Sequence, residues 1–130
     1  MTTETITTGE GKKTYRCYIA YKTPGLNDYI RECRGNRYVA ARTKKQLEFF
    51  LSSRMKHAPE FTGPVFLNFE WIEKDHKRDP DNVAFGKKFV LDALVKGGKI
   101  PNDTQRYIAG FRDTFTYGDE YGLRLTITEV

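Results

Sequence analysis

Strict alternation of apolar residues marks the stretch 64–72. Every second side chain there is large and apolar: Val65, Leu67, Phe69 and Trp71. Because successive side chains of a strand point to opposite faces, this pattern predicts a long strand with one buried face. A β-branched and aromatic run at 15–21, followed by the turn pair Pro24-Gly25, predicts an earlier strand.

Helical spacing marks three further stretches. Apolar residues recur three and four positions apart at Leu26, Tyr29, Ile30 and Cys33. This predicts a short helix, which Gly35-Asn36 ends in a left-handed conformation. A second helix is expected from about Arg37 to near His57, and a third from about Val83 to Lys96, ended by Gly97-Gly98.

The remaining segments complete a predicted α+β fold. Two β-rich runs, 106–117 and 122–129, are joined by four turn-forming residues and are typical of a hairpin. Residues 1–13 are rich in Thr, Gly and charge, so we expect a mobile arm before a domain at 14–130. The predicted domain is small and single, with a mixed β-sheet of about four strands and helices packed mostly on one face.

Composition narrows the class of protein. With 130 residues the chain has room for one domain, and 38% hydrophobic residues are enough for it to fold. No apolar run approaches the roughly 20 residues of a transmembrane helix, and the first residues lack a signal-peptide pattern. We therefore expect a cytoplasmic protein without a membrane partner. Cys17 and Cys33 have no ligands at metal spacing nearby, which argues against a structural zinc site or a disulfide scaffold.

Charge is distributed unevenly along the chain. Residues 1–60 hold 12 Lys and Arg against 6 Asp and Glu, whereas residues 61–130 hold 10 against 11. A basic half of this kind suits a polyanion, although many basic domains bind no nucleic acid. The second predicted helix carries the candidate DNA contacts Arg42, Lys44 and Lys45.

Two carboxylates stand two residues apart in the sequence Arg-Asp-Pro-Asp-Asn. Pro80 favours an extended backbone at Asp79, so Asp79 and Asp81 can project the same way. Converging carboxylates repel each other unless a cation or a proton lies between them, and Mg²⁺ or Mn²⁺ meets that need. The same sequence also suits a helix N-cap and an Asx-turn without any metal.

Two more groups have both a structural and a functional interpretation. Lys88 and Asp92 lie four residues apart on a predicted helix, which is ordinary for a surface pair. Lys88 could also place a cation where charge develops on a phosphate. Asp103, in Ile-Pro-Asn-Asp-Thr-Gln, is equally suited to a plain turn.

Three segments together resemble a known family. They are Lys-Arg-Asp-Pro-Asp-Asn at 77–82, Lys-Phe-Val-Leu-Asp-Ala-Leu at 88–94, and Gly-Gly-Lys-Ile-Pro-Asn-Asp-Thr-Gln at 97–105. Their order and spacing resemble the RusA-type Holliday junction resolvases, over about residues 65–115. Lys88 and Asp92 are four apart, and Asp103 follows eleven residues after Asp92.

The resemblance implies a set of site residues and an activity. Asp79, Asp81 and Asp103 would be catalytic metal ligands for Mg²⁺, with Mn²⁺ as a substitute, and Lys88 the catalytic lysine. Lys77 and Arg78 would contact the DNA backbone. This chain has six residues between Asp81 and Lys88, where the family has about three, so Lys87 remains a rival to Lys88 and is otherwise a DNA contact.

The expected function is that of a magnesium-dependent crossover junction endodeoxyribonuclease. It would resolve four-way junctions and other branched DNA by paired symmetric nicks, in recombination and repair or in the clearing of branched phage or prophage DNA. Because a four-way junction has near two-fold symmetry, the expected assembly is a homodimer with one site per subunit. The alternatives are a non-catalytic nucleic-acid-binding module and a metal-dependent nuclease for flaps or single strands.

Overall fold

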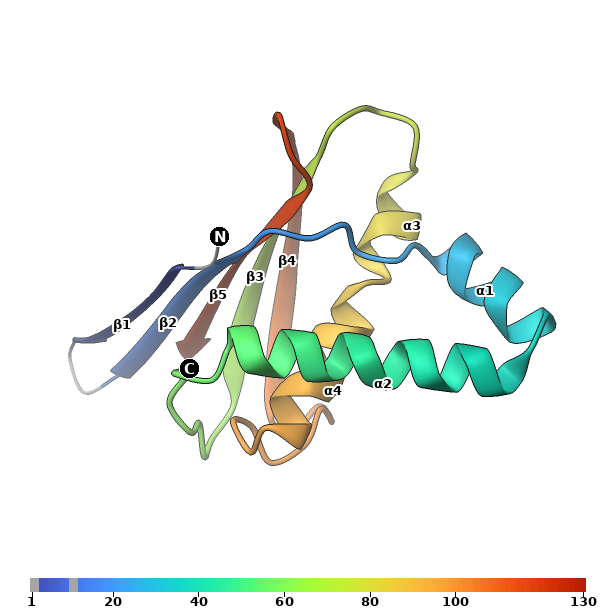
Figure 1. Cartoon of the computed structure of the whole chain (residues 1–130). Coiled ribbons are helices and arrows are strands. Elements are labelled where there is room, and N and C mark those ends of the chain that lie inside the picture. Colours follow the sequence, from blue (N-terminus) through green and yellow to red (C-terminus); the bar gives the residue numbers. More distant parts are fainter. Residues whose placement is uncertain (1–2, 10–11) are drawn as a thin grey trace.

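The computed structural model describes residues 3–9 and 12–130. Five strands form one mixed sheet, and the helices cover one of its faces (Figure 1). The strands are β1 (Thr3–Gly9), β2 (Lys12–Ile19), β3 (Val65–Glu73), β4 (Ile108–Tyr117) and β5 (Gly122–Glu129). The helices are α1 (Leu26–Arg34), α2 (Arg37–Arg54), α3 (Pro80–Ala84) and α4 (Lys87–Lys96). The predicted α+β class with helices on one face is confirmed, with five strands instead of about four.

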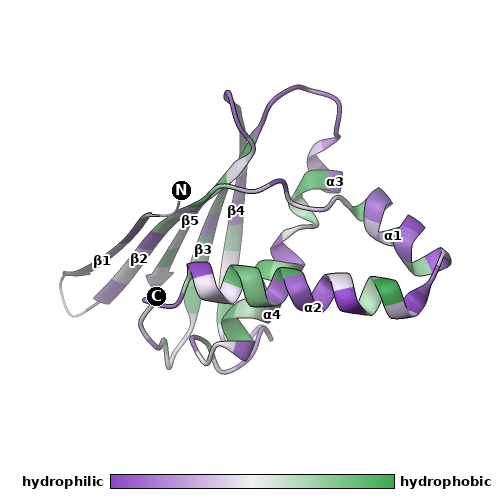
Figure 2. Ribbon diagram, in the orientation of Figure 1, coloured by the Kyte–Doolittle hydropathy of each residue, from purple (hydrophilic) through white to green (hydrophobic). Residues whose placement is uncertain are grey.

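The core lies between the sheet and α2 and α4. The predicted alternation of β3 is confirmed, because Val65, Leu67 and Phe69 have no exposed surface and Trp71 has 1%. Figure 2 shows apolar residues gathered along the strands and α4, with polar residues at the outer ends of the helices. None of the helices among the described residues is long and apolar enough to cross a bilayer.

The first segment differs from the mobile arm that we expected at 1–13. Residues Thr3–Gly9 form β1, which pairs antiparallel with β2. The buried Tyr15 of β2 donates its hydroxyl hydrogen bond to Glu4 at 2.5 Å, and burial raises the pKa of that hydroxyl above its ordinary value. The expected domain start at Thr14 therefore falls inside β2, while residues 1–2 and 10–11 lie outside the described residues.

The two C-terminal strands do not form the predicted hairpin. The strand order is β1-β2-β5-β3-β4, so β3 lies between β4 and β5. β3 pairs antiparallel with β5 and parallel with β4, which the chain reaches through α3 and α4. The loop at 118–121 therefore crosses the end of β3, where the Gly118 amide donates to the Glu73 carbonyl at 3.0 Å. The strand that separates the two runs is β3. Its apolar sequence suits a central strand, which is paired on both edges.

The predicted helix at 83–96 is divided in two. Phe85 and Gly86 keep right-handed backbone angles, but the amides of Gly86, Lys88 and Phe89 donate to carbonyls three residues earlier. This tight turn ends α3 and begins α4. The predicted stop after α4 is confirmed: Gly98 has φ of 73° and the Lys99 amide donates to the Leu94 carbonyl.

The predicted left-handed stop at Gly35 is wrong. Gly35 has φ of −80°, outside the left-handed region. The adjacent Asn36 instead caps α2, because its side-chain oxygen accepts from the amides of Tyr38 and Val39. Asn36 therefore separates the two helices by starting the second.

Close packing at Gly86 generates a stability prediction. A Cβ at this position would lie 1.9 Å from Thr23 Oγ1 and 3.0 Å from Thr23 Cβ. We expect Gly86→Ala to lower the free energy of unfolding by about 1–3 kcal/mol, measured by urea denaturation. Thr23→Ala in the same background should recover part of that loss, and a fully additive double variant would contradict the contact.

Candidate functional site

The Asp79–Asp81 segment follows the loop at the end of β3. Asp79 occupies the residue before α3 with an extended backbone, φ −69° and ψ 151°, as Pro80 requires. Its side chain makes no capping hydrogen bond, so the N-cap interpretation lacks its defining contact. Asp81 Oδ1 accepts only from the adjacent Asn82 amide, at 3.0 Å. Both carboxylates are exposed, and neither forms an ion pair with any residue that the structure describes.

A buried ion pair anchors this segment to β3. Arg78 Nε and Nη2 each donate to a Glu73 carboxylate oxygen at 2.8 Å, and Arg78 Nη1 donates to the Thr23 carbonyl at 2.7 Å. The side chains are 13% and 7% exposed, and hydrogen bonding to Glu73 raises the pKa of Arg78. Arg78 is thus turned toward Glu73, away from the DNA contact that we expected. This orientation leaves Asp79 and Asp81 without a neutralising neighbour.

Asn82 ties α3 to the start of α1. Its side-chain oxygen accepts from the Asn27 amide at 3.0 Å. Asn82 also packs closely against Gly25, because a Cβ at Gly25 would lie 2.7 Å from the same Asn82 oxygen. The fourth residue of the Asp-Pro-Asp-Asn motif therefore has a structural role.

Lys87 and Lys88 point to different partners. Lys87 Nζ lies 2.5 Å from Asp113 Oδ2 and 4.7 Å from the centre of the Phe111 ring. Asp113 Oδ1 in turn accepts from Trp71 Nε1 at 2.9 Å, so Lys87 is fixed against β3 and β4. Lys88 Nζ makes a long contact, 3.8 Å, with Asp92 Oδ2 at the next turn of α4, and the Lys88 side chain is 46% exposed.

Asp103 lies at the other end of the sheet. It is five residues before β4, whose first residue, Ile108, pairs with Val65 at the start of β3. Asp79 follows the end of β3, and the strand between these ends spans about 26 Å. Across residues 3–9 and 12–130, no three His, Cys, Asp or Glu side chains lie where they could share a metal ion. A single chain therefore does not bring Asp103 to Asp79 and Asp81.

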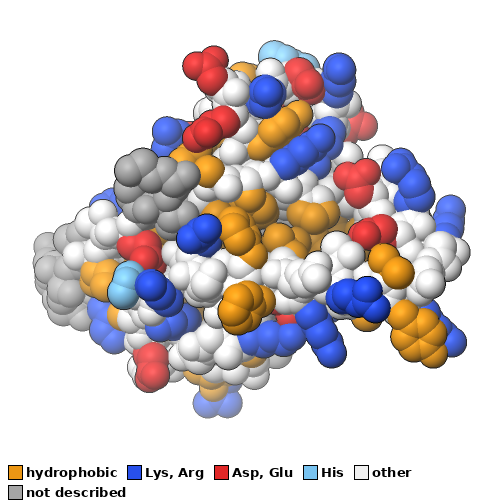
Figure 3. Space-filling view, in the orientation of Figure 1, with side chains coloured by type: hydrophobic (Ala, Val, Ile, Leu, Met, Phe, Trp, Pro, Cys, Tyr) orange, Lys and Arg blue, Asp and Glu red, His pale blue; other side chains and the backbone are white. Residues whose placement is uncertain are grey.

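The basic residues predicted to contact DNA differ in exposure and in whether their charges are already paired with carboxylates. Figure 3 shows Lys and Arg side chains spread over the helical side of the molecule. Arg42, Lys45 and Lys77 are exposed. Lys44 Nζ instead lies 3.8 Å from Glu48 and 3.7 Å from Asp92, so it neutralises carboxylates between α2 and α4.

Asp113 and Glu73 are the residues that sequence reasoning missed. Each is an acid on the same face of its strand as large apolar side chains: Asp113 lies between Phe111 and Phe115, and Glu73 follows Trp71 by two residues. An acid on an apolar face needs a cation or a donor, which the structure provides as Lys87, Trp71 and Arg78. An acidic residue at a position where the alternation calls for an apolar one is the signal that could have identified Asp113 and Glu73.

Comparison with known proteins adds no family. No family model and no curated protein matches the chain. Among solved structures, one chain of "Crystal structure of HypE-HypF complex" aligns with this chain, with 11% sequence identity and a TM-score of 0.41. The alignment covers 95% of this chain and 34% of that chain. A likeness of this degree carries no information on family or activity.

The Arg78–Glu73 pair generates a prediction. Glu73→Gln leaves the guanidinium in a largely buried place without its counter-charge, so we expect a loss of about 3 kcal/mol in the free energy of unfolding. Urea denaturation at neutral pH would measure it. The control is Glu70→Gln, which breaks an Arg124–Glu70 pair whose side chains are 61% and 29% exposed. That change should cost under about 1 kcal/mol. Equal losses in the two variants would show that the buried pair does not hold the loop.

Proposed function

We propose that this chain is a metal-dependent, structure-selective endodeoxyribonuclease of the RusA type that cleaves branched DNA. The observation that carries the proposal is the pair Asp79 and Asp81, two exposed carboxylates at the start of α3, directly after a residue, Arg78, that a buried ion pair anchors. The ordered motifs at 77–82, 88–94 and 97–105 support the same activity, because they resemble that family in residue type and spacing.

The donor chemistry of Asp79 and Asp81 fits a hard divalent cation. Mg²⁺ is commonly held by one or two carboxylates, with waters and substrate phosphates completing its shell. Asp79 and Asp81 would supply the protein ligands, and neither is neutralised by Arg78. Bound there, the ion would polarise a phosphodiester and acidify an attacking water. Within the described residues, one chain brings two carboxylates to this place and not a third. A site with two carboxylates is compatible with a metal ion that binds together with DNA, because phosphate oxygens would supply further ligands.

Lys88 is better placed than Lys87 to act on a phosphate. Its side chain is about half exposed, and its ammonium makes only a long contact to Asp92. Lys87 is held by Asp113 over two aromatic rings, so moving it would break a 2.5 Å ion pair. Lys88 can therefore offset negative charge on the reacting phosphate, while Lys87 positions α4 on the sheet.

The first test is cleavage of a synthetic four-way junction, with a linear duplex of the same sequence beside it. Wild type should make paired symmetric nicks in the junction with Mg²⁺ and none with EDTA. Asp79→Asn and Asp81→Asn should eliminate cleavage and keep or improve junction affinity, because each removes a negative charge near phosphate.

Asp119→Asn is the matched control, since it removes an exposed carboxylate from the loop at 118–121. It should cleave like wild type. Junction binding without cleavage in Mg²⁺ or Mn²⁺ would instead leave a non-catalytic binding module. Equal cutting of forks and single strands would favour a nuclease of broader specificity.

The position of Asp103 generates a second test, on the homodimer. Because β3 separates Asp103 from the Asp79–Asp81 pair, Asp103 can join that site only from the other subunit. Asp79→Asn and Asp103→Asn homodimers should each be inactive. Heterodimers that combine the two variants should regain one active site and nick one strand of the junction. An inactive heterodimer would place Asp103 within its own subunit's site. An active Asp103→Asn homodimer would place Asp103 outside catalysis.

A further inference from the structure

The face of the sheet that carries no helix is polar and open. Alternation along the strands places one set of side chains on this open face, opposite the core. A straight row crosses all five strands in register, because Thr5 pairs with Arg16, Arg16 with Thr126, Thr126 with Asn68, and Asn68 with Arg112. The row therefore has a hydroxyl and an amide between two guanidinium groups whose Cα atoms lie three strand spacings, about 14 Å, apart.

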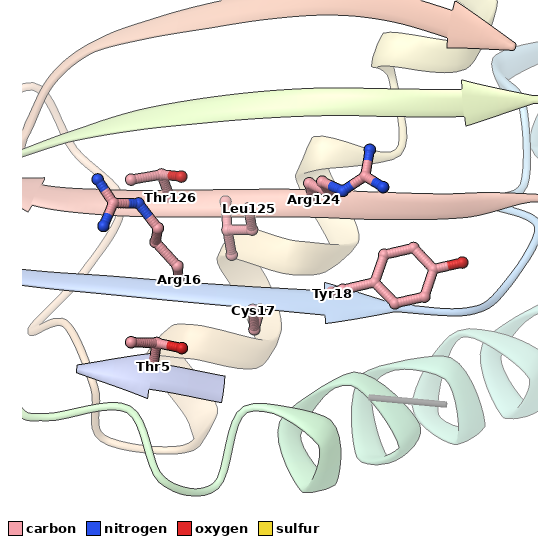
Figure 4. A pocket seen from close by; sticks show the side chains of 7 residues that line it. All are labelled: Thr5, Arg16, Cys17, Tyr18, Arg124, Leu125 and Thr126. Atoms are coloured by element: carbon pink, nitrogen blue, oxygen red, sulfur yellow. The ribbon is translucent and has the colours of Figure 1, made fainter. Parts of the chain in front are cut away.

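A shallow hollow of about 190 Å³ lies on this face between β1, β2 and β5. Figure 4 shows Arg16 and Arg124 on its two sides, with the hydroxyls of Thr5 and Thr126 beside them. The described residues that line it are Thr5, Arg16, Cys17, Tyr18, Arg124, Leu125 and Thr126, and none of them is a carboxylate. The hollow thus offers guanidinium and hydroxyl donors without an acid.

The charges of the open face are only partly neutralised. Arg124 Nη1 donates to Glu70 at 2.6 Å, and Tyr18 donates its hydroxyl to Glu120 at 2.5 Å. Arg16 and Arg112 are both exposed, and neither forms an ion pair within the described part of the chain. Two guanidinium groups without an ion pair among the described residues, those of Arg16 and Arg112, therefore stand at the second and fifth positions of the row.

The same charges decide what can cover this face. A second copy of the chain would add two more unpaired arginines to the interface. The large apolar side chains that the structure shows as exposed on this face, Phe66 at 39% and Val130 at 64%, lie toward one end of the sheet. A stable protein interface needs an apolar centre, which the described residues of this face do not form. A phosphate backbone instead needs guanidinium and hydroxyl donors spaced along a line, and arginine binds phosphate in a bidentate manner.

We propose that the open face binds the phosphate backbone of DNA. One phosphate occupies the hollow beside Arg16, and the backbone continues along the row to Arg112. The identity of the polyanion rests on the proposed function. The surface lies on the opposite side of the sheet from α1, α2 and α4, so it is separate from the basic residues of α2 (Figure 1). Such contacts are independent of sequence, so they act on a linear duplex and on a junction alike.

The test is the affinity of the full chain for a labelled duplex and a labelled four-way junction, in EDTA and over a range of salt. The double variant Arg16→Gln, Arg112→Gln should bind both about tenfold more weakly at low salt. The slope of log affinity against log salt should be smaller in magnitude by about 1–2, because each arginine is expected to contact one phosphate. Both side chains are exposed, so the melting temperature should not change.

The matched control is Arg31→Gln, Arg34→Gln, which removes two exposed charges from α1 on the helical side. It should retain near wild-type affinity and salt slope. The charge-preserving Arg16→Lys, Arg112→Lys should keep the salt slope but lose part of the affinity, because lysine cannot bind a phosphate in a bidentate manner. Equal losses in the open-face and α1 variants would reduce the effect to net charge and overturn the proposal, as would wild-type binding by the open-face variant.

Junction cleavage, measured in parallel, separates this proposal from the proposed function. If wild type cleaves with Mg²⁺ while the open-face variant binds normally, the nuclease stands and the binding face does not. If the open-face variant alone loses affinity and no protein cleaves with any metal, the binding face stands and the nuclease does not. A wild-type chain that binds no DNA overturns both.

Discussion

The packing of β3 between β4 and β5 is the constraint on which the rest of the structure depends. Its core-facing side chains are almost completely buried, and both of its edges are hydrogen-bonded. Since β4 runs parallel to β3, the chain must return from one end of the sheet to the other before β4 begins, and α3 and α4 make that return. The Asp79–Asp81 segment lies at the start of this return and Asp103 at its finish. The separation of the three predicted carboxylates is therefore a consequence of strand direction.

Much of the fold could be predicted because local patterns determine it. The alternation at 64–72, the spacing of α1 and the glycine stop after α4 each arise within a few residues. The hairpin prediction was wrong because no local pattern shows that β3 lies between β4 and β5. The N-terminal strand was missed because its threonine-rich, polar sequence lacks the apolar alternation of a buried strand, and β1 lies at the edge of the sheet, paired with β2 alone.

The candidate site was predictable as a set of residues but not as an arrangement. Motif order suggested Asp79, Asp81 and Lys88, while the partners that fix their surroundings come from distant positions. Glu73 directs Arg78 inward, and Asp113 holds Lys87, which distinguishes the two neighbouring lysines. Long-range ion pairs of this kind depend on the packing of strands and helices, so a single sequence does not display them.

The pairing of β2 with β5 has a consequence for how the chain folds during synthesis. Thr14 lies opposite Thr128, so two strands separated by almost the whole described chain are neighbours in the middle of the sheet. Until β5 has left the ribosome, β2 and β3 each have an unpaired edge, and the helices have no complete sheet to cover. Such non-local pairing slows folding and leaves strand edges open to other chains. The nascent sheet is therefore most exposed to misassociation just before β5 is added.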